Sequence, residues 1–158
     1  MNENIKNYNL SVIKGVEAID QLNIAVDLNS NDIYKTKVIG VLDKVYLGND
    51  YFDVFLKIRA DLEKLSLFLA SKGCLKNVMP SGMSRDWSEG LTAYQLDEAT
   101  LESTQVDIYA PVFESEYQNL CSYIQQVEYK KAFMKKNKER FIERNKKLEI
   151  DLKKKYGY

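Results

Sequence analysis

A chain of 158 residues that is 45% hydrophobic and 29% charged is large enough to fold by itself. Such a length buries about two-thirds of the surface that the unfolded chain exposes, and the composition excludes intrinsic disorder. No apolar run approaches the roughly 18 residues of a membrane-spanning helix, and the first residues lack the pattern of a signal peptide. We therefore expect a soluble, cytoplasmic protein, folded as a single domain over 1–158, with no membrane partner.

The formal net charge is zero, but the two signs are separated along the chain. Residues 1–129 contain 11 Lys and Arg against 19 Asp and Glu, a net charge of −8, whereas residues 130–158 contain 12 against 4, a net charge of +8. A chain divided in this way either folds its basic end onto its acidic body or presents both to partners of opposite charge.

The first 73 residues carry apolar positions that recur every three or four residues, which is the spacing of one helix face. Three such stretches occur, at about 9–26, 31–46 and 50–69. Short connections between consecutive helices favour antiparallel neighbours. We therefore predict a three-helix layer over 1–73.

Helical spacing is interrupted over about 75–109, where turn residues and short alternating runs replace it. The run MPSG at 79–82 has the proline and glycine positions of a type I turn. Residues 91–96 and 106–109 have the alternation and the β-branched or aromatic content of strands, and 75–79 is a candidate third strand. We therefore predict a two- or three-stranded antiparallel β insert that leans on the helices.

Residues 112–156 contain neither proline nor glycine and return to helical spacing. We predict a helix over about 114–135, followed by a second helical segment to about 155. Polar residues interrupt the pattern near 135–138, so the second segment either continues the first or bends back. The predicted fold class is α+β and predominantly helical, with the β insert between helical halves and a basic C-terminal helical segment.

The chain has no histidine, which excludes Ser-His and Cys-His nucleophile pairs and most transition-metal sites. Ser84 stands in the run GMSRD, which is similar to a nucleophile elbow without its second glycine. Cys74 and Cys121 form no CxxC pair, and we expect free thiols. No phosphate-binding loop or calcium loop occurs, so we expect no catalytic residue, cofactor or metal ion.

The loop at 81–90 combines residue types that are enriched at the centres of protein interfaces. These residues are Met83, Arg85 and Trp87. Two interpretations remain open. In one, Trp87 and Arg85 anchor a partner. In the other, Trp87 fills a gap between the insert and the helices, while Arg85 pairs with Asp86 or Glu89.

The C-terminal segment raises a hypothesis of nucleic-acid binding, because lysines and arginines on one face would bind phosphates in a salt-dependent way. Around a helix, however, these side chains occur on nearly every side, and the acidic body opposes such a partner. A helix at a membrane surface is a further option, although its apolar face is thin. The basic residues are Lys130, Lys131, Lys135, Lys136, Lys138, Arg140, Arg144, Lys146, Lys147, Lys153, Lys154 and Lys155.

Residues 78–109 carry a pattern that resembles small uncharacterised bacterial proteins with a PSGM turn and an AYxL strand. The matching runs are VMPSGMSRD at 78–86, AYQL at 93–96 and VDIY at 106–109. By type, the chain is similar to the immunity proteins that protect bacteria from polymorphic or contact-dependent toxins. The resemblance implies a small domain without an active site, which binds a cognate toxin domain tightly and occludes its active site.

The sequence therefore predicts a non-catalytic protein-binding protein, an immunity-type inhibitor whose acidic body meets a cationic toxin such as a nuclease. One alternative is a small enzyme in which Arg85 holds an anionic substrate and Asp86 or Glu89 acts as the base. A second alternative is a nucleic-acid-binding module that uses the basic C-terminal helix. The candidate partner-binding residues are Met83, Arg85, Asp86, Trp87, Glu89, Asp97, Glu98 and Glu102.

Overall fold

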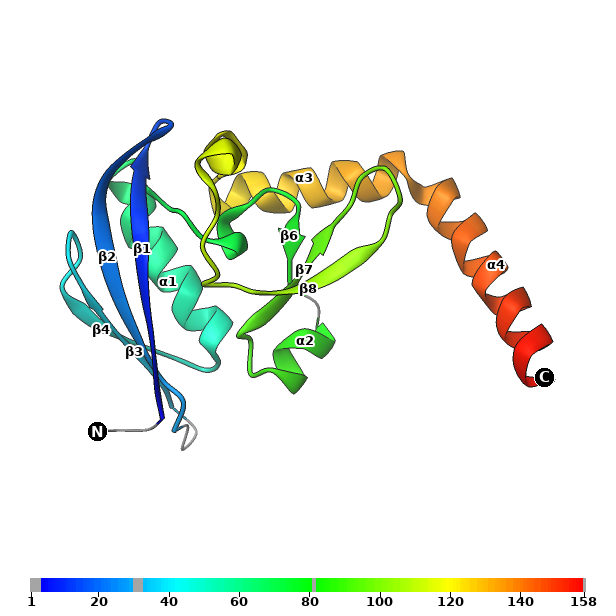
Figure 1. Cartoon of the computed structure of the whole chain (residues 1–158), viewed down its shortest axis with the longest axis horizontal. Helices are drawn as coiled ribbons and strands as arrows, with labels where there is room; N and C mark the ends of the chain where they lie inside the picture. Colours follow the sequence, from blue (N-terminus) through cyan, green and yellow to red (C-terminus); the bar gives the residue numbers. More distant parts are fainter. Residues whose placement is uncertain (1–3, 30–32, 81, 158) are drawn as a thin grey trace.

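The computed structural model describes residues 4–29, 33–80 and 82–157, without the side chains of 82–84. Two antiparallel sheets and a set of helices make up these ranges (Figure 1). The strands are β1 (Ile5–Lys14), β2 (Glu17–Asp27), β3 (Tyr34–Ile39), β4 (Lys44–Gly48), β5 (Phe68–Leu69), β6 (Val78–Met79), β7 (Thr92–Leu96) and β8 (Ser103–Asp107). The α-helices are α1 (Tyr51–Lys64), α2 (Gly82–Trp87), α3 (Tyr123–Lys136) and α4 (Lys138–Tyr156). The chain is α+β with 40% helix and 34% strand, so the prediction of a predominantly helical fold with a small β insert is wrong.

Strands β1 to β4 lie where the sequence predicted the first two helices. They belong to a curled five-stranded sheet of order β4-β3-β2-β1-β5. In β2, Leu22, Ile24 and Val26 are buried while Asn23 between them is exposed, which is the two-residue period of a strand. The three-helix layer over 1–73 is therefore wrong, because along β2 and β3 alternate residues face the core rather than every third or fourth.

Two glycines allow the tight connections of this sheet. Gly15, between β1 and β2, has a φ of +66°, and Gly40, between β3 and β4, has a φ of +146°. Both lie in the region that residues with a side chain rarely adopt. A Cβ on Gly40 would also stand 2.8 Å from the carbonyl oxygen of Gln21. Gly15 therefore lies in the turn of the β1–β2 hairpin, whereas the sequence prediction placed it in the middle of the first helix.

Helix α1 confirms the third predicted helix, and it packs against the five-stranded sheet. Asp50 caps its N-terminus by accepting a hydrogen bond from the Asp53 backbone N–H at 2.6 Å. The helix ends at Lys64 rather than at the predicted Gly73, because Ser66 adopts a left-handed backbone with a φ of +58°. Burying each large apolar side chain contributes about 1.5–3 kcal/mol, so the apolar face of α1 holds helix and sheet together. Its buried residues are Tyr51, Phe52, Val54, Phe55, Ile58, Arg59 and Leu62.

The predicted β insert exists as a three-stranded antiparallel sheet of order β6-β7-β8. β7 pairs with β8 in a register that sets Tyr94 opposite Gln105, and Val78–Met79 supplies the third strand. The three strands are thus present, but β8 begins at Ser103 and ends at Asp107 instead of covering 106–109, and β6 is limited to Val78–Met79. They form the second sheet of the molecule rather than its only one. Residue 81 of the predicted turn at 79–82 lies outside the described residues.

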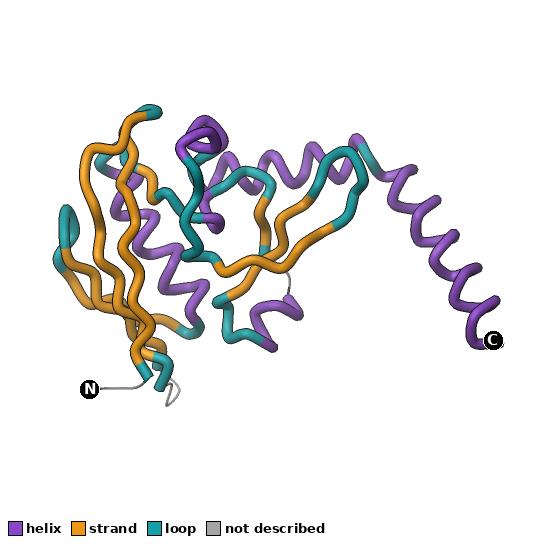
Figure 2. Tube along the Cα trace, viewed as in Figure 1, coloured by secondary structure: helices purple, strands orange, loops and turns teal. Residues whose placement is uncertain are grey.

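The C-terminal part is helical and broken near the predicted position. A 3₁₀ helix at Glu114–Asn119 precedes α3, and α4 follows α3 after Asn137. The helix predicted from residue 114 begins instead at Tyr123, where Ser122 and Gln125 form a capping box. Figure 2 shows α4 leaving the body of the molecule at an angle to α3. None of the helices within the described ranges has the length and apolar character needed to cross a membrane.

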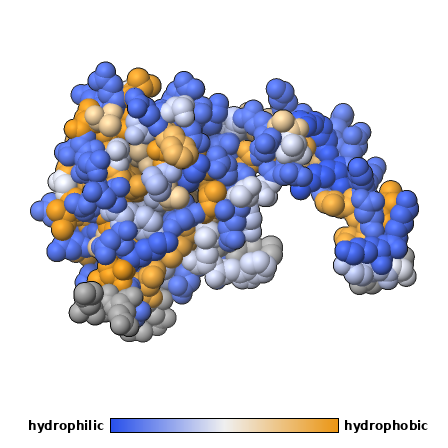
Figure 3. Space-filling model, in the orientation of Figure 1, coloured by the Kyte–Doolittle hydropathy of each residue, from blue (hydrophilic) through white to orange (hydrophobic). Residues whose placement is uncertain are grey.

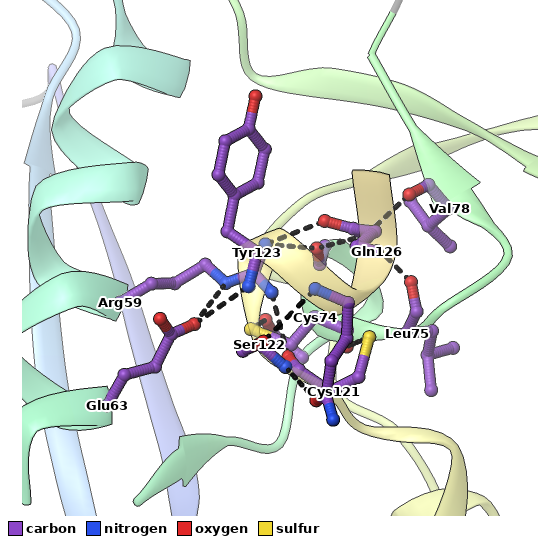
Figure 4. Close-up of polar contacts among 12 residues, drawn as sticks. Arg59, Glu63, Cys74, Leu75, Val78, Cys121, Ser122, Tyr123 and Gln126 are labelled. Atoms are coloured by element: carbon purple, nitrogen blue, oxygen red, sulfur yellow. Dashed lines mark hydrogen bonds and ion pairs between the residues drawn. The ribbon is translucent and has the colours of Figure 1, made fainter. Parts of the chain in front are cut away.

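A buried arginine joins α1 to the C-terminal part of the chain. Arg59 is 2% exposed, and its guanidinium donates to Gln126 Oε1 at 2.8 Å and to the Cys121 carbonyl oxygen at 2.9 Å (Figure 4). Glu63 lies 3.7 Å from Arg59 Nε. Arg59 and Gln126 thus connect α1 to the start of α3, although the two helices are far apart in sequence. The Gln126 amide nitrogen donates in turn to the carbonyl oxygens of Gly73, Leu75 and Val78.

Replacing Arg59 by methionine tests how far the fold depends on this network. Methionine fills similar space but leaves the Gln126 and Cys121 acceptors without their donor, so we expect the free energy of unfolding to fall by about 3 kcal/mol. Lys57→Met is the matched control, because the Lys57 side chain is 51% exposed and surface pairs contribute only about 0–1 kcal/mol. Urea unfolding followed by circular dichroism measures both. Equally small losses in the two variants would contradict the role of the network.

Candidate partner-binding surface

The eight predicted residues fall into two groups rather than one surface. Five lie in α2 and the turn after it, and three lie in the turn that joins β7 to β8. The two groups stand at opposite ends of the three-stranded sheet (Figure 1). The β7–β8 group consists of Asp97, Glu98 and Glu102. These three residues are therefore not part of the surface around α2.

Arg85 anchors α2 to the N-terminus of α1. Its guanidinium donates from Nε to Asp50 Oδ2 at 2.7 Å and from Nη2 to Asp50 Oδ1 at 3.0 Å, a bidentate pair. The guanidinium also stands 5.2 Å from the centroid of the Phe52 ring. The hydrogen bond to Asp50 raises the pKa of Arg85 further above its ordinary value. The interpretation that Arg85 pairs with Asp86 or Glu89 is therefore wrong, and Arg85 fixes the position of α2.

Trp87 projects from this anchored helix. It is 76% exposed, so the interpretation that it fills a gap between the insert and the helices is wrong. Asp86 beside it is exposed as well. The side chain of Met83 lies outside the described residues. An exposed tryptophan leaves a large apolar area in contact with water, and tryptophan is a residue type enriched at the centres of protein interfaces.

The turn after α2 is seated directly on α1. The Glu89 carbonyl oxygen accepts a hydrogen bond from the Tyr51 backbone N–H at 2.8 Å, and the Glu89 carboxylate accepts one from the Tyr34 hydroxyl at 3.2 Å. Gly90 has a φ of +87°, and a Cβ there would stand 2.6 Å from the Phe52 backbone nitrogen. Only glycine permits so close an approach. Trp87 is therefore held between two attachments to the same end of α1.

Two acidic residues of the β7–β8 turn make hydrogen bonds, one within the turn and one to α3. Asp97 accepts hydrogen bonds from the backbone N–H groups of Thr100 and Ala99, which lower the pKa of its carboxyl. Glu98 accepts a hydrogen bond from the hydroxyl of Tyr129. Both carboxylates thus have structural partners within the molecule, as in a closed turn packed on a helix.

Two arginines of the basic segment bind the same turn. Arg140 donates to the Ala99 carbonyl oxygen at 2.7 Å, and Arg144 donates to that of Leu101. Leu101 is buried and has a φ of +61°. These contacts attach the start of α4 to the hairpin. They also engage two cations that the nucleic-acid hypothesis assigns to phosphates, which weakens that hypothesis.

The enzyme hypothesis requires a pocket that is lined by Arg85, Asp86 and Glu89. The structure has an open cavity of about 480 Å³, but it lies near the β7–β8 turn. This cavity is separate from the residues to which the hypothesis assigns substrate and base. Its polar lining residues are Lys76, Asn77, Gln95, Asp97, Glu98, Glu116 and Asn119. Over the part of the chain that the structure describes, no group of three or more Cys, Asp or Glu side chains is placed to hold a metal ion.

The two cysteines lie side by side although they are 47 residues apart in sequence (Figure 4). The Cys121 backbone N–H donates to the Cys74 carbonyl oxygen at 3.1 Å, and both thiols are free. Burial raises the pKa of the Cys74 thiol, and it raises the pKa of the Cys121 thiol to about 11. Because the thiolate is the reactive form, both residues are weak nucleophiles near neutral pH.

Neither a protein-family model nor a curated protein matches the sequence. The candidate site is therefore identified by its geometry and its exposure. Arg85 fixes α2 to Asp50, and Trp87 and Asp86 are exposed on this helix.

Thiol labelling at about pH 8 tests the environment of the two cysteines. A pKa of about 11 lowers the thiolate fraction of Cys121 about 100-fold, and burial also lowers the thiolate fraction of Cys74. We expect both native thiols to react with Ellman's reagent at least about tenfold more slowly than an exposed cysteine introduced by Asn145→Cys. In urea all thiols should react at one rate. Rapid reaction of either native cysteine in the folded protein would contradict the buried arrangement.

Proposed function

We propose that this chain is a non-catalytic protein-binding protein of the immunity type, which binds a cognate toxin domain through the surface around Trp87. The proposal is carried by the 76% exposure of Trp87 on a helix that Arg85 fixes to Asp50. Folding leaves this large apolar side chain in water while its backbone is firmly attached. Tryptophan is among the residues that contribute most of the binding energy at interface centres, and a fixed position lowers the entropy lost on binding.

The charge around Trp87 selects the kind of partner. Asp86 and Glu89 are exposed close to it in sequence, and residues 1–129 carry a net charge of −8. A cationic toxin domain, such as a nuclease with a basic substrate groove, would be attracted to this surface before contact. Acidic side chains that occupy the groove would then keep its substrate out. We place this encounter in the cytosol, where the substrate of such a toxin lies.

The candidate residues have different roles in this proposal. Trp87 and Asp86 contact the toxin, and Arg85 positions the helix that carries them. The carboxylates of the β7–β8 turn stand at the other end of the sheet, so they contribute to the negative potential rather than to contact. The contact surface is thereby smaller than the set of residues that the sequence suggested.

Trp87→Ala and Asp86→Lys are the variants that test the proposal. With the toxin domain encoded beside this gene as the ligand, we expect each variant to bind at least about 30-fold more weakly, since the loss of a central interface residue costs about 2 kcal/mol or more. Isothermal titration calorimetry gives the dissociation constant, and the survival of cells that express the toxin gives the functional readout.

Phe113→Ala is the matched control for these variants. Phe113 is 77% exposed and lies outside α2, so its removal takes away a similar apolar area at a different place and should leave toxin binding unchanged. Equal melting temperatures would show that binding, not folding, was altered. Wild-type affinity in Trp87→Ala would disprove the assigned surface, and a wild-type chain that ignores the toxin would disprove the immunity function.

A further inference from the structure

Helix α4 forms an arm that leaves the body of the molecule (Figures 1 and 3). It has 19 residues, and none of its described residues is buried. The contacts that attach it lie in its first two turns, where Arg140 and Arg144 bind the β7–β8 turn. There the ring of Phe141 also lies 6.1 Å from that of Phe133, centroid to centroid. Beyond Arg144 the arm projects into solvent.

A projecting helix of this length needs a surface to pack against. Isolated helices shorter than about 12–15 residues are marginal in water, and the part of α4 beyond Arg144 is of that length. The ion pair of Glu149 with Lys153, at 3.1 Å, adds only about 0.2–0.5 kcal/mol. In proteins the stability of a helix comes mainly from the burial of an apolar face. The arm is therefore expected to be covered in solution.

The arm has an apolar stripe on the side that faces the body. Leu148 and Leu152 follow Phe141 by seven and eleven residues, which places all three on one side of the helix. Their exposed fractions are 48% for Leu148 and 51% for Leu152. Phe141 and Arg144 face inward at the root of the arm, so the stripe continues along the notch between arm and body that Figure 3 shows.

The body across this notch carries groups that complement the arm. α2, with the exposed Trp87 and Asp86, lies on the body opposite α4 (Figure 1). α4 itself holds eight Lys and Arg against four Asp and Glu, a net charge of +4. An arm of this net charge is attracted to the acidic body. The arm and the α2 surface are thus complementary in charge and in apolar area.

We propose that a second copy of this chain occupies the notch, and that two copies exchange their α4 arms about a two-fold axis. Each arm lays Leu148 and Leu152 against Trp87 of the other copy and brings the lysines at 153–155 close to Asp86. The interface is isologous, because the same two patches meet twice. It covers the stripe that a single chain leaves exposed, and it joins the positive and negative parts of the sequence.

This inference stands without the proposed immunity function. Where both hold, dimerisation and toxin binding compete for Trp87, and the dimer is a resting form that the toxin dissociates. A test of the dimer without toxin therefore separates the two proposals. The variant Leu148→Glu/Leu152→Glu, which is outside the toxin surface, should then bind toxin more tightly than the wild type rather than more weakly.

Sedimentation equilibrium of the full-length protein is the primary experiment. Over about 1–200 µM the wild type should show about twice the 18.3 kDa mass of one chain at low salt. It should dissociate near 1 M salt, where the Debye length falls to about 3 Å. Leu148→Glu/Leu152→Glu should raise the dimer dissociation constant more than about 30-fold. Ile150→Glu is the matched control: Ile150 is 54% exposed on the opposite side of α4, and its variant should remain dimeric.

A charge exchange tests the orientation of the arm. Asp86→Lys should weaken the dimer, and its combination with Lys153→Glu/Lys154→Glu should restore it, because the attraction is rebuilt with the signs reversed. A wild type that is monomeric at every concentration overturns the proposal, and so does a dimer that is insensitive to the Leu148 and Leu152 substitutions. A monomer that retards duplex DNA through the same lysines also overturns it, in favour of a nucleic-acid interface.

Discussion

The buried charge of Arg59 is the constraint on which the rest of the structure depends. A guanidinium removed from water costs several kcal/mol unless its donors are satisfied, and α1 itself offers only the carboxylate of Glu63. The remaining acceptors are the carbonyl oxygens of Gly73 and Cys121 and the side-chain oxygen of Gln126. The chain beyond residue 73 must therefore return to this side chain at 121–126, which specifies where α3 meets α1.

The same helix supports the candidate surface at its other end. Asp50 caps α1 and at the same time accepts both hydrogen bonds of Arg85, so one carboxylate orders α1 and attaches α2. The backbone N–H of Tyr51, which the first turn of a helix leaves unpaired, is taken by the carbonyl oxygen of Glu89. The exposure of Trp87 is thus a consequence of how the N-terminus of α1 is satisfied. A disturbance of α1 would alter both the surface around α2 and the packing of α3.

Sequence patterning predicted the elements whose period is unambiguous and failed where two periods coincide. The stripe of α1 and the alternation of β7 match one template each. In β2, Leu22 and Val26 fit helical spacing and are also alternate residues of a strand, since a four-residue interval is close to one helical turn and is also even. The informative signals were Ile24, which completes an alternating buried triad, and Gly15, which suits a hairpin better than a helix interior. The β1–β2 hairpin could therefore have been predicted by counting how many apolar positions match the helical period and how many match the strand period.

The residue types of the candidate site were predictable, but their partners were not. An arginine, a tryptophan and acidic residues in one loop have a composition that is typical of an interaction surface. The pairing of Arg85 with Asp50 spans 35 residues, and the approach of Cys121 to Cys74 spans 47, so both depend on the tertiary fold. Local sequence carries no information on such distances. The roles of anchor and contact within the loop could be divided only after the fold was known.

The separation of charge along the sequence is preserved in the fold rather than cancelled by it. Arg140 and Arg144 reach the body through carbonyl oxygens, and Lys153 pairs with Glu149 of its own helix. The bend at Asn137 is held by hydrogen bonds of its side chain to the Phe133 carbonyl oxygen and to Arg140, so α4 is directed away from the body instead of folding onto it. A molecule that keeps a net −8 part and a net +8 part apart has a large dipole, and an oppositely oriented second copy supplies the complementary field for both parts at once. A partner that carries charge of only one sign would complement only one of these two parts. Charge therefore favours a second copy of this chain, rather than such a partner, as the molecule that covers α4.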